Sequence, residues 1–379
     1  MTRAGLLIAA ALLGAPAGAE IVVSANDGKQ VLLDGAQIVP AHPAPDCISI
    51  LDLDRGRLRV VDTLPVATSV IGPPRSVAIT PDGAFAIVTA ARRIVRDDPT
   101  KIEPDDQVTL VDLRSHPARI VSVVHAGAGA SGVAIDPSGT RVLVANRAAG
   151  TVSLFGLRGA ALTMLATIPL GEATSSPAQP LFFAKGTRAL VTRDADHRIS
   201  VLAIEGDTMR ALPRALAGGL RPYAIDTAGP RRFAVVGNIG GGGTDTDTMS
   251  LIDLTLPEPR VVDTVAIGLT PEGLKMSPDG RFVAVNVNNG SNNARRSPTW
   301  SDHGELQVWR IDGGRLRLAT RARIGGWGQG VAWSKDGRTI LVQTMLDKGL
   351  TAFAFDGRVL RSGQRIELPA GPAAMAMAE

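Results

Sequence analysis

The sequence predicts an all-β fold, a seven-bladed β-propeller. Three observations support this prediction. A unit of alternating apolar strands with a Pro-Asp-Gly-type turn returns about every 50 residues. The last unit contains only a first strand, and the strands it lacks are found at the other end of the chain. No stretch of the expected mature chain shows a convincing helical period. Repeats of this length with about four short strands each are typical of propeller blades.

The N-terminal residues are typical of a secretory signal peptide. A short basic start is followed by an apolar run over 4–13 and by the small-residue sequence Ala17-Gly18-Ala19. The run is too short for a membrane helix, and no later stretch reaches the ~18 consecutive apolar residues that one needs. We therefore expect cleavage near Ala19-Glu20, a periplasmic or secreted protein, and a signal peptide (1–19) followed by one propeller domain (20–379).

Each repeat follows one plan. A first strand ends in a turn such as Pro81-Asp82-Gly83, Pro137-Ser138-Gly139 or Pro278-Asp279-Gly280. Proline presets φ, and glycine accepts the left-handed conformation that tight turns need. Second, third and fourth strands follow, rich in Val and Ile, as expected for strands between neighbouring sheets. Aligning the units on the first apolar residue of each opening strand gives Val77, Val133, Leu181, Tyr223, Leu274, Val331 and Met375.

The two ends of the mature chain are predicted to share one blade. The C-terminal sequence GPAAMAMAE is a single strand, and EIVVSANDGKQVLLDG at 20–35 supplies the strands that should follow it. Pairing them would close the ring and remove two exposed sheet edges. With only one cysteine, Cys47, the chain has no intramolecular disulfide to hold the ring, so closure and packing must do so.

At VLVAN…GTVSLF and ALVTR…HRISVL the chain resembles the repeat of the YVTN-type seven-bladed propellers. The resemblance covers nearly the whole mature chain. Proteins with this repeat include bacterial propeller lactonases, quinoprotein amine dehydrogenase heavy chains and exported propellers with no assigned reaction. The resemblance therefore implies the fold and does not select one activity.

Long insertions mark one face of the predicted ring. They follow second strands, at 35–47, 92–107, 239–248 and 287–304, whereas the turns between first and second strands stay short. Insertions on one face of a repeat array are typical of the binding face.

A column of polar residues is predicted at the channel mouth on the insertion face. The residues two before the alignment positions are polar in six of seven units: Arg75, Ser131, Gln179, Arg221, Glu272 and Gln329. Converging Arg, Glu and Gln side chains suit a small anionic or polyhydroxylated ligand.

A second set of candidates ends the second strands. It contains Asn146, Arg193 and Asn238, with Asn286 and Gln343 one position earlier in their units. Asn286 and Gln343 either project toward the mouth or form hydrogen bonds within the blade. Trp300 and Trp327, in or near loops, are better candidates for stacking on a ligand than Trp309 and Trp333.

Several kinds of chemistry lack a motif in this sequence. There is no Gly-x-Ser-x-Gly, no phosphate loop, no haem-attachment motif and no His spacing typical of a metal site, so no cofactor or metal is indicated. The sequence has 40 basic and 36 acidic residues. The basic residues form no block of the kind that binds nucleic acid.

Three functions remain compatible with the sequence. The first is an exported propeller that binds a small polar or anionic ligand, or a partner protein, at the channel mouth. The second is a lactonase-like hydrolase, with Glu272 as the catalytic carboxylate and Arg75, Arg221 and Asn286 as polarising groups. The third is the propeller subunit of an amine-dehydrogenase-like redox complex.

Overall fold

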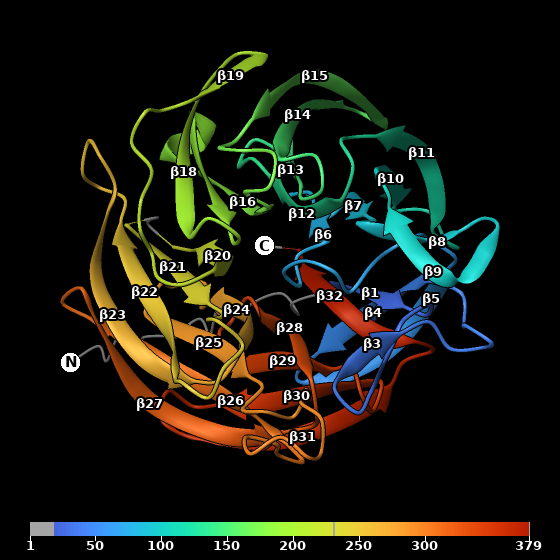
Figure 1. The fold of residues 1–379 in the computed structure, drawn as a ribbon, viewed down its shortest axis with the longest axis vertical. Coiled ribbons are helices and arrows are strands. Elements are labelled where there is room, and N and C mark those ends of the chain that lie inside the picture. Colours follow the sequence, from blue (N-terminus) through green and yellow to red (C-terminus); the bar gives the residue numbers. More distant parts are fainter. Residues whose placement is uncertain (1–18, 230–231, 379) are drawn as a thin grey trace, which may run out of the picture.

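The described residues form a ring of seven four-stranded antiparallel sheets around a central channel (Figure 1). The computed structural model describes residues 19–229 and 232–378. The predicted signal peptide, apart from Ala19, lies outside these residues. The ring confirms the seven-bladed propeller that the repeat predicts.

The first four blades each contain four strands, which follow one another from the channel outward. Blade 1 contains β32 (Gly371–Met377), β1 (Glu20–Asp27), β4 (Cys47–Asp54) and β5 (Arg57–Leu64). Blade 2 contains β6 (Val77–Ile79), β7 (Phe85–Thr89), β10 (Gln107–Asp112) and β11 (Arg119–His125). Blade 3 contains β12 (Ala130–Ile135), β13 (Arg141–Asn146), β14 (Thr151–Arg158) and β15 (Ala161–Pro169). Blade 4 contains β16 (Pro177–Phe183), β17 (Arg188–Arg193), β18 (Arg198–Glu205) and β19 (Thr208–Ala211).

The other three blades have the same order. Blade 5 contains β20 (Pro222–Thr227), β21 (Phe233–Asn238), β22 (Asp247–Asp253) and β23 (Arg260–Gly268). Blade 6 contains β24 (Pro271–Met276), β25 (Phe282–Val287), β26 (Gly304–Asp312) and β27 (Arg315–Ile324). Blade 7 contains β28 (Gly328–Trp333), β29 (Thr339–Thr344), β30 (Gly349–Phe355) and β31 (Leu360–Glu367).

Burial falls from the channel outward, as the sequence pattern of each strand requires. The second strands β7 and β29 are buried along their whole length, because neighbouring blades cover both of their faces. The outer strand β23 alternates between exposed and half-buried residues over most of its length, since only one of its faces is covered. Val- and Ile-rich strands are therefore found where sheet packs on sheet.

The hydrophobic core consists of layers between adjacent blades. One layer joins blades 1 and 2 through Val23, Ile48 and Val88, and another joins blades 1 and 7 through Leu51 and Leu341. Each blade is thus held by its two neighbours, so the ring must be closed for every layer to be complete.

The last strand closes the ring as the sequence predicts. β32 pairs antiparallel with β1, with Val22 opposite Met377 and Ser24 opposite Met375. Across to blade 7, the Gln343 side chain donates hydrogen bonds to the Ala374 carbonyl at 2.9 Å and to Ser24 Oγ at 2.7 Å. In Figure 1, β32 and β1 lie beside each other although they come from opposite ends of the chain.

Two of the four insertions contain hairpins. They are β2 (Val31–Leu33) with β3 (Ala36–Ile38), and β8 (Arg92–Val95) with β9 (Asp98–Pro104). The first hairpin begins at Val31, before the predicted 35–47, so only one of the strands predicted at 20–35 belongs to the blade. The first hairpin reaches the blade 6 insertion, where Asp34 Oδ1 accepts a hydrogen bond from the Arg295 amide at 2.7 Å. Insertions from blades 1 and 6 therefore meet on the same face.

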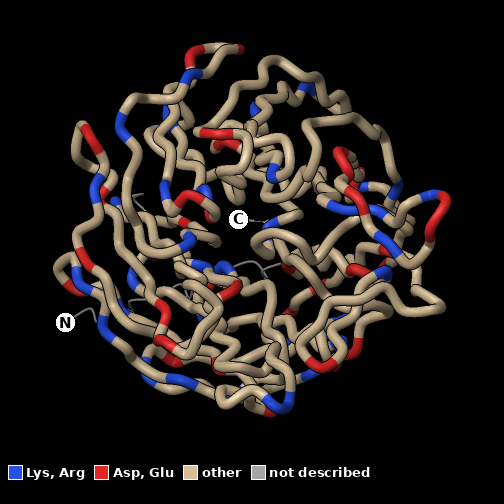
Figure 2. Tube along the Cα trace, viewed as in Figure 1, with Lys and Arg blue, Asp and Glu red and all other residues tan. Residues whose placement is uncertain are grey.

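The described residues contain little helix, and their charges do not gather on one side of the ring (Figure 2). One short 3₁₀ helix, Ala184–Gly186, occurs, and no helix among the described residues is long and apolar enough to span a membrane. Figure 2 shows basic and acidic residues interspersed around the ring and on loops near its centre.

Candidate functional site

Strand pairing places different residues at the channel mouth in blades 4 and 5 than the sequence alignment predicts. In blades 3 to 7 the first strand begins opposite the last residue of the second strand and then contains a β-bulge. After the bulge, Pro180 in blade 4 and Ile225 in blade 5 are equivalent to Val133 in blade 3. The alignment on Leu181 and Tyr223 is therefore wrong by one and two residues.

The corrected column at the mouth keeps four of the six predicted polar residues and has other residues in the remaining three blades. It runs through Arg75, Ser131, Ala178, Tyr223, Glu272, Gln329 and Ala373. Gln179 lies one position beyond this column, and Arg221 lies just before the first strand of blade 5, with a positive φ of 54°.

Two of the predicted ligand-binding residues join neighbouring blades. The Gln179 side chain donates to the Ile225 carbonyl at 2.6 Å and accepts from the Ile225 amide at 3.1 Å. Asn286 accepts from the Gly273 amide at 3.2 Å and donates to the Gln329 carbonyl in blade 7. Both side chains are at most 1% exposed, so their hydrogen bonds stabilise the ring.

Three other predicted residues are held by partners of their own. Asn146 and Asn238 donate to hydroxyl groups on the third strand of their own blades, Ser153 at 2.9 Å and Ser250 at 3.2 Å. Arg193 forms an ion pair with Asp196, with its Nε 3.1 Å and its Nη2 2.8 Å from the two carboxylate oxygens. These contacts fix the ends of the second strands.

Glu272 is the most chemically distinctive group at the mouth. It lies half-buried in the bulge of β24. Burial raises the pKa of its carboxyl from 4.5 to about 7, although Arg221, Arg147 and an interaction with the Trp327 side chain lower it. Residues of blades 3, 5 and 7 therefore act on one carboxyl group of blade 6.

A buried network of opposite charges adjoins Glu272. Asp194 Oδ2 lies 2.9 Å from Arg147 Nη2 and 3.4 Å from Arg221 Nη2, and the Asp194 side chain is only 2% exposed. The Arg147 guanidinium lies 5.8 Å from the centre of the Tyr223 ring. Burial, followed by the negative charge of Glu272, raises the pKa of the Tyr223 phenol, so Tyr223 is a neutral hydrogen-bond donor at physiological pH.

Arg147 and Asp194 were not among the predicted ligand-binding residues. Each directly follows the last residue of a second strand, and Asp27 follows the equivalent residue, Asn26, in blade 1. The sequence could have indicated them, because charged residues recur at this one position of the repeat.

Several polar atoms at the mouth are buried without a hydrogen-bond partner in the described part of the chain. They are Ser131 Oγ, Arg147 Nη1, Asp194 Oδ1 and Gln329 Oε1. Buried polar atoms are normally satisfied, so these four are exceptions that gather at the mouth.

A linker between β5 and β6 covers part of the mouth. Its Val70 packs against Trp327, Met345 and Ala373. A Cβ atom on its Gly72, which has a φ of 109°, would lie 2.0 Å from Ser131 Oγ. The linker thus passes from blade 7 toward blade 3, and Trp327, at 3% exposed, is covered rather than free to stack on a ligand.

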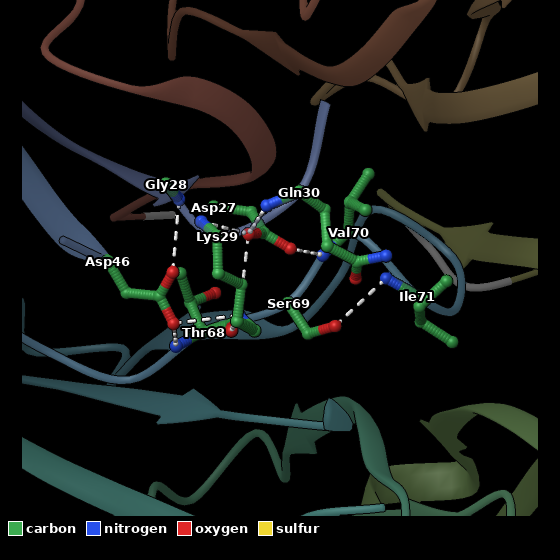
Figure 3. Close-up of polar contacts among 9 residues, drawn as sticks. All are labelled: Asp27, Gly28, Lys29, Gln30, Asp46, Thr68, Ser69, Val70 and Ile71. Carbon is green, nitrogen blue, oxygen red and sulfur yellow. Dashed lines mark hydrogen bonds and ion pairs between the residues drawn. The ribbon is translucent and has the colours of Figure 1, made fainter. Parts of the chain in front are cut away.

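A buried ion cluster anchors this linker (Figure 3). Lys29 Nζ lies 2.7 Å from Asp46 Oδ2 and 3.4 Å from Asp27 Oδ1, and it donates to the Thr68 carbonyl. Asp27 Oδ2 accepts from the Val70 amide at 2.8 Å. Burial raises the pKa of Asp27, and the positive charge of Lys29 opposes that rise.

Arg75 does not join the Glu272 network. Its Nη2 lies 3.7 Å from Asp226 Oδ1 in blade 5, and its side chain lines a cavity that opens at the Pro-Asp-Gly turns, opposite the insertions. Arg75 therefore keeps its predicted place in the column, but its side chain is directed into the channel and away from the insertion-face rim.

Comparison with solved structures shows the fold alone. A protein from Bacteroides fragilis, provisionally assigned as a 6-phosphogluconolactonase, is 14% identical, with a TM-score of 0.74 and coverage of 96% of this chain and 98% of that one. The periplasmic gluconolactonase of Pseudomonas aeruginosa is 16% identical, with a TM-score of 0.70 and coverage of 95% and 99%. Hydrazine synthase of Kuenenia stuttgartiensis is 17% identical, with a TM-score of 0.63 and coverage of 82% and 90%.

No model of a protein family matches the sequence, and no curated protein matches it. The fold that these neighbours share with the chain is the seven-bladed β-propeller.

Proposed function

We propose that this protein is an exported hydrolase that opens the ring of lactones derived from small hydroxy acids, with the reaction at the Glu272 side of the channel mouth. The observation that carries the proposal is a half-buried carboxyl with a pKa of about 7 beside two arginines from other blades. The fold shared with proteins named as gluconolactonases supports the same reaction class.

Glu272 suits the role of general base. A carboxylate with a pKa of about 7 is substantially ionised at neutral pH and still basic enough to accept a proton from water. The water oxygen attacks the lactone carbonyl carbon, and the negative charge that develops on the carbonyl oxygen is stabilised by Arg221 and Arg147. The ring C–O bond then breaks, and its oxygen takes the proton from Glu272, giving the open hydroxy acid.

The buried polar atoms around the mouth suit a hydroxylated substrate. Ser131 Oγ and Gln329 Oε1 have no partner among the described residues, and sugar-acid hydroxyl groups would satisfy them once the segments that cover them move aside. Arg221, with 38% of its side chain exposed, is positioned to hold the product carboxylate.

Glu272→Gln tests the proposed reaction. Hydrolysis of D-glucono-1,5-lactone by the purified protein is followed by base uptake in a pH-stat, against the spontaneous rate. We expect the variant to lose about 100-fold or more in kcat, since it keeps the shape of Glu272 and removes the base. Glu103→Gln, on the exposed β9 hairpin, is the matched control and should keep the wild-type rate. Equal rates in wild type and Glu272→Gln would refute the assignment.

A second candidate, ligand binding without turnover, is favoured by the same unpartnered buried atoms. It predicts that gluconate raises Tm although no lactone is consumed. Replacing both Arg147 and Arg221 with Ala should abolish that rise. An unchanged rise in the double variant would remove the mouth as the binding site.

A further inference from the structure

The channel contains a cavity of about 630 Å³ on the face opposite the insertions. Each blade contributes the residue that follows its corrected alignment position on the first strand. These residues are Ala78, Ala134, Leu181, Asp226, Lys275, Ala332 and Ala376, and all seven line the cavity. Four of the seven are alanine, so the short side chains keep the channel open at this level.

The walls of the cavity are mostly apolar. Phe182, Met276, Trp333 and Met375 line it together with the alanines. The Trp333 indole donates to the Lys275 carbonyl at 3.0 Å, which fixes the ring of Trp333 against the wall. Such a surface buries the apolar body of a ligand.

The inner end of the cavity carries charge from three blades. Asp226 is held by Lys275 Nζ at 3.1 Å and by the Met276 amide at 2.9 Å, so its negative charge is compensated within the wall. Arg75 reaches the same carboxylate from blade 2 at only 3.7 Å, beyond hydrogen-bond distance. Its buried Nε makes no hydrogen bond to any described residue.

Among the described residues at this end of the cavity, Arg75 is therefore a second positive charge beside one carboxylate, Asp226, which Lys275 also contacts. A guanidinium binds carboxylates and phosphates through several N–H groups in one plane, and Arg75, with 19% of its side chain exposed, has only the 3.7 Å ion pair with Asp226 among the described residues. The other acid in the lining, Asp136, is paired with Arg141 at 3.4 Å.

We infer that this cavity is a second ligand site, which takes an amphipathic monoanion, with its carboxylate on Arg75 and its hydrocarbon part against the alanines and Trp333. The inference does not depend on the proposed hydrolysis, because the Glu272 network lies on the other face of the ring.

Calorimetric titration with octanoate, 1-octanol and acetate tests separately the binding of the carboxylate and the binding of the hydrocarbon chain. We expect octanoate to bind at one site, 1-octanol about tenfold more weakly for lack of the charge, and acetate more weakly still for lack of the apolar body. Equal affinity for octanoate and 1-octanol, or no heat with octanoate, would overturn it.

Two variants locate the site. Ala134→Leu fills the cavity from a half-buried position and should abolish octanoate binding. Arg75→Gln should weaken octanoate about tenfold and leave 1-octanol unchanged. Ala161→Leu and Arg158→Gln change the same residue types at exposed positions of blade 3 and should bind as wild type does. Thermal melts confirm that each variant is folded, and wild-type octanoate affinity in a folded Ala134→Leu protein would contradict the assignment.

Discussion

Glu272 should make the free energy of unfolding of the propeller depend on pH, and Glu272→Gln should remove that part of the dependence. The pKa of its carboxyl is raised in the folded protein, from 4.5 to about 7. The folded state therefore binds the Glu272 proton more tightly than the unfolded state does. Stability from this group is fully present below pH about 4.5 and is lost as the pH rises through about 7.

The size of the effect follows from the two pKa values. A rise from 4.5 to about 7 corresponds to about 3 kcal/mol between the two protonation states. Glu272 is half-buried, and water screens part of this cost, so we expect about 1–3 kcal/mol. Glu272→Gln has no charge to desolvate, and it should be more stable than wild type by this amount at pH 8 and by almost nothing at pH 4.5.

Urea denaturation of both proteins at intervals from pH 4.5 to 8 measures the difference. Comparing variant with wild type at each pH cancels the titration of the groups that do not interact with Glu272. Glu205→Gln, at the exposed end of β18, is the matched control and should stay within about 0.5 kcal/mol of wild type at every pH. A pH-independent difference for Glu272→Gln would refute the burial argument.

Three further predictions concern the ring and its linker. Lys29→Met leaves Asp27 and Asp46 buried without their cation, so we expect about 3–5 kcal/mol of destabilisation in urea at pH 7 and less at low pH, where Asp27 is protonated. A similar loss at all pH values would contradict the ion-pair argument. Removal of 371–379 deletes the strand that pairs with β1, and we expect the cooperative melt to disappear; a melt like that of the full chain would show that closure is dispensable. Gly72→Ala forces a side chain into a φ of 109° beside Ser131 and should cost about 1–3 kcal/mol, whereas unchanged stability would mean that the linker does not press on the mouth.

The repeat pattern was sufficient to predict the architecture. Seven apolar first strands with short turns specify seven blades, and the lone strand at the C-terminus specifies the partner of β1. These features are local, so they can be read from one sequence without any knowledge of contacts.

The register of the first strands could not be predicted as well. Each bulge adds residues to one strand without changing the apolar character of its neighbours, so Leu181 and Tyr223 looked equivalent to Val133. A shift of one or two positions then assigned Gln179 and Arg221 to a column that Ala178 and Tyr223 occupy.

The candidate site depends on contacts that sequence order does not show. Glu272 was a candidate, but its pKa depends on Arg147, which belongs to a blade on another side of the channel. Arg75 also looked like a rim residue until its pairing with Asp226 placed it inside the channel.

The pH dependence of kcat/KM for lactone opening tests the role of Glu272 most directly, because it reports ionisation of the base in the free enzyme. We expect wild-type activity to fall below an inflection at pH about 7, and no such inflection in the residual activity of Glu272→Gln. An inflection near pH 4.5, or an identical profile in both proteins, would show that this carboxyl is not the base.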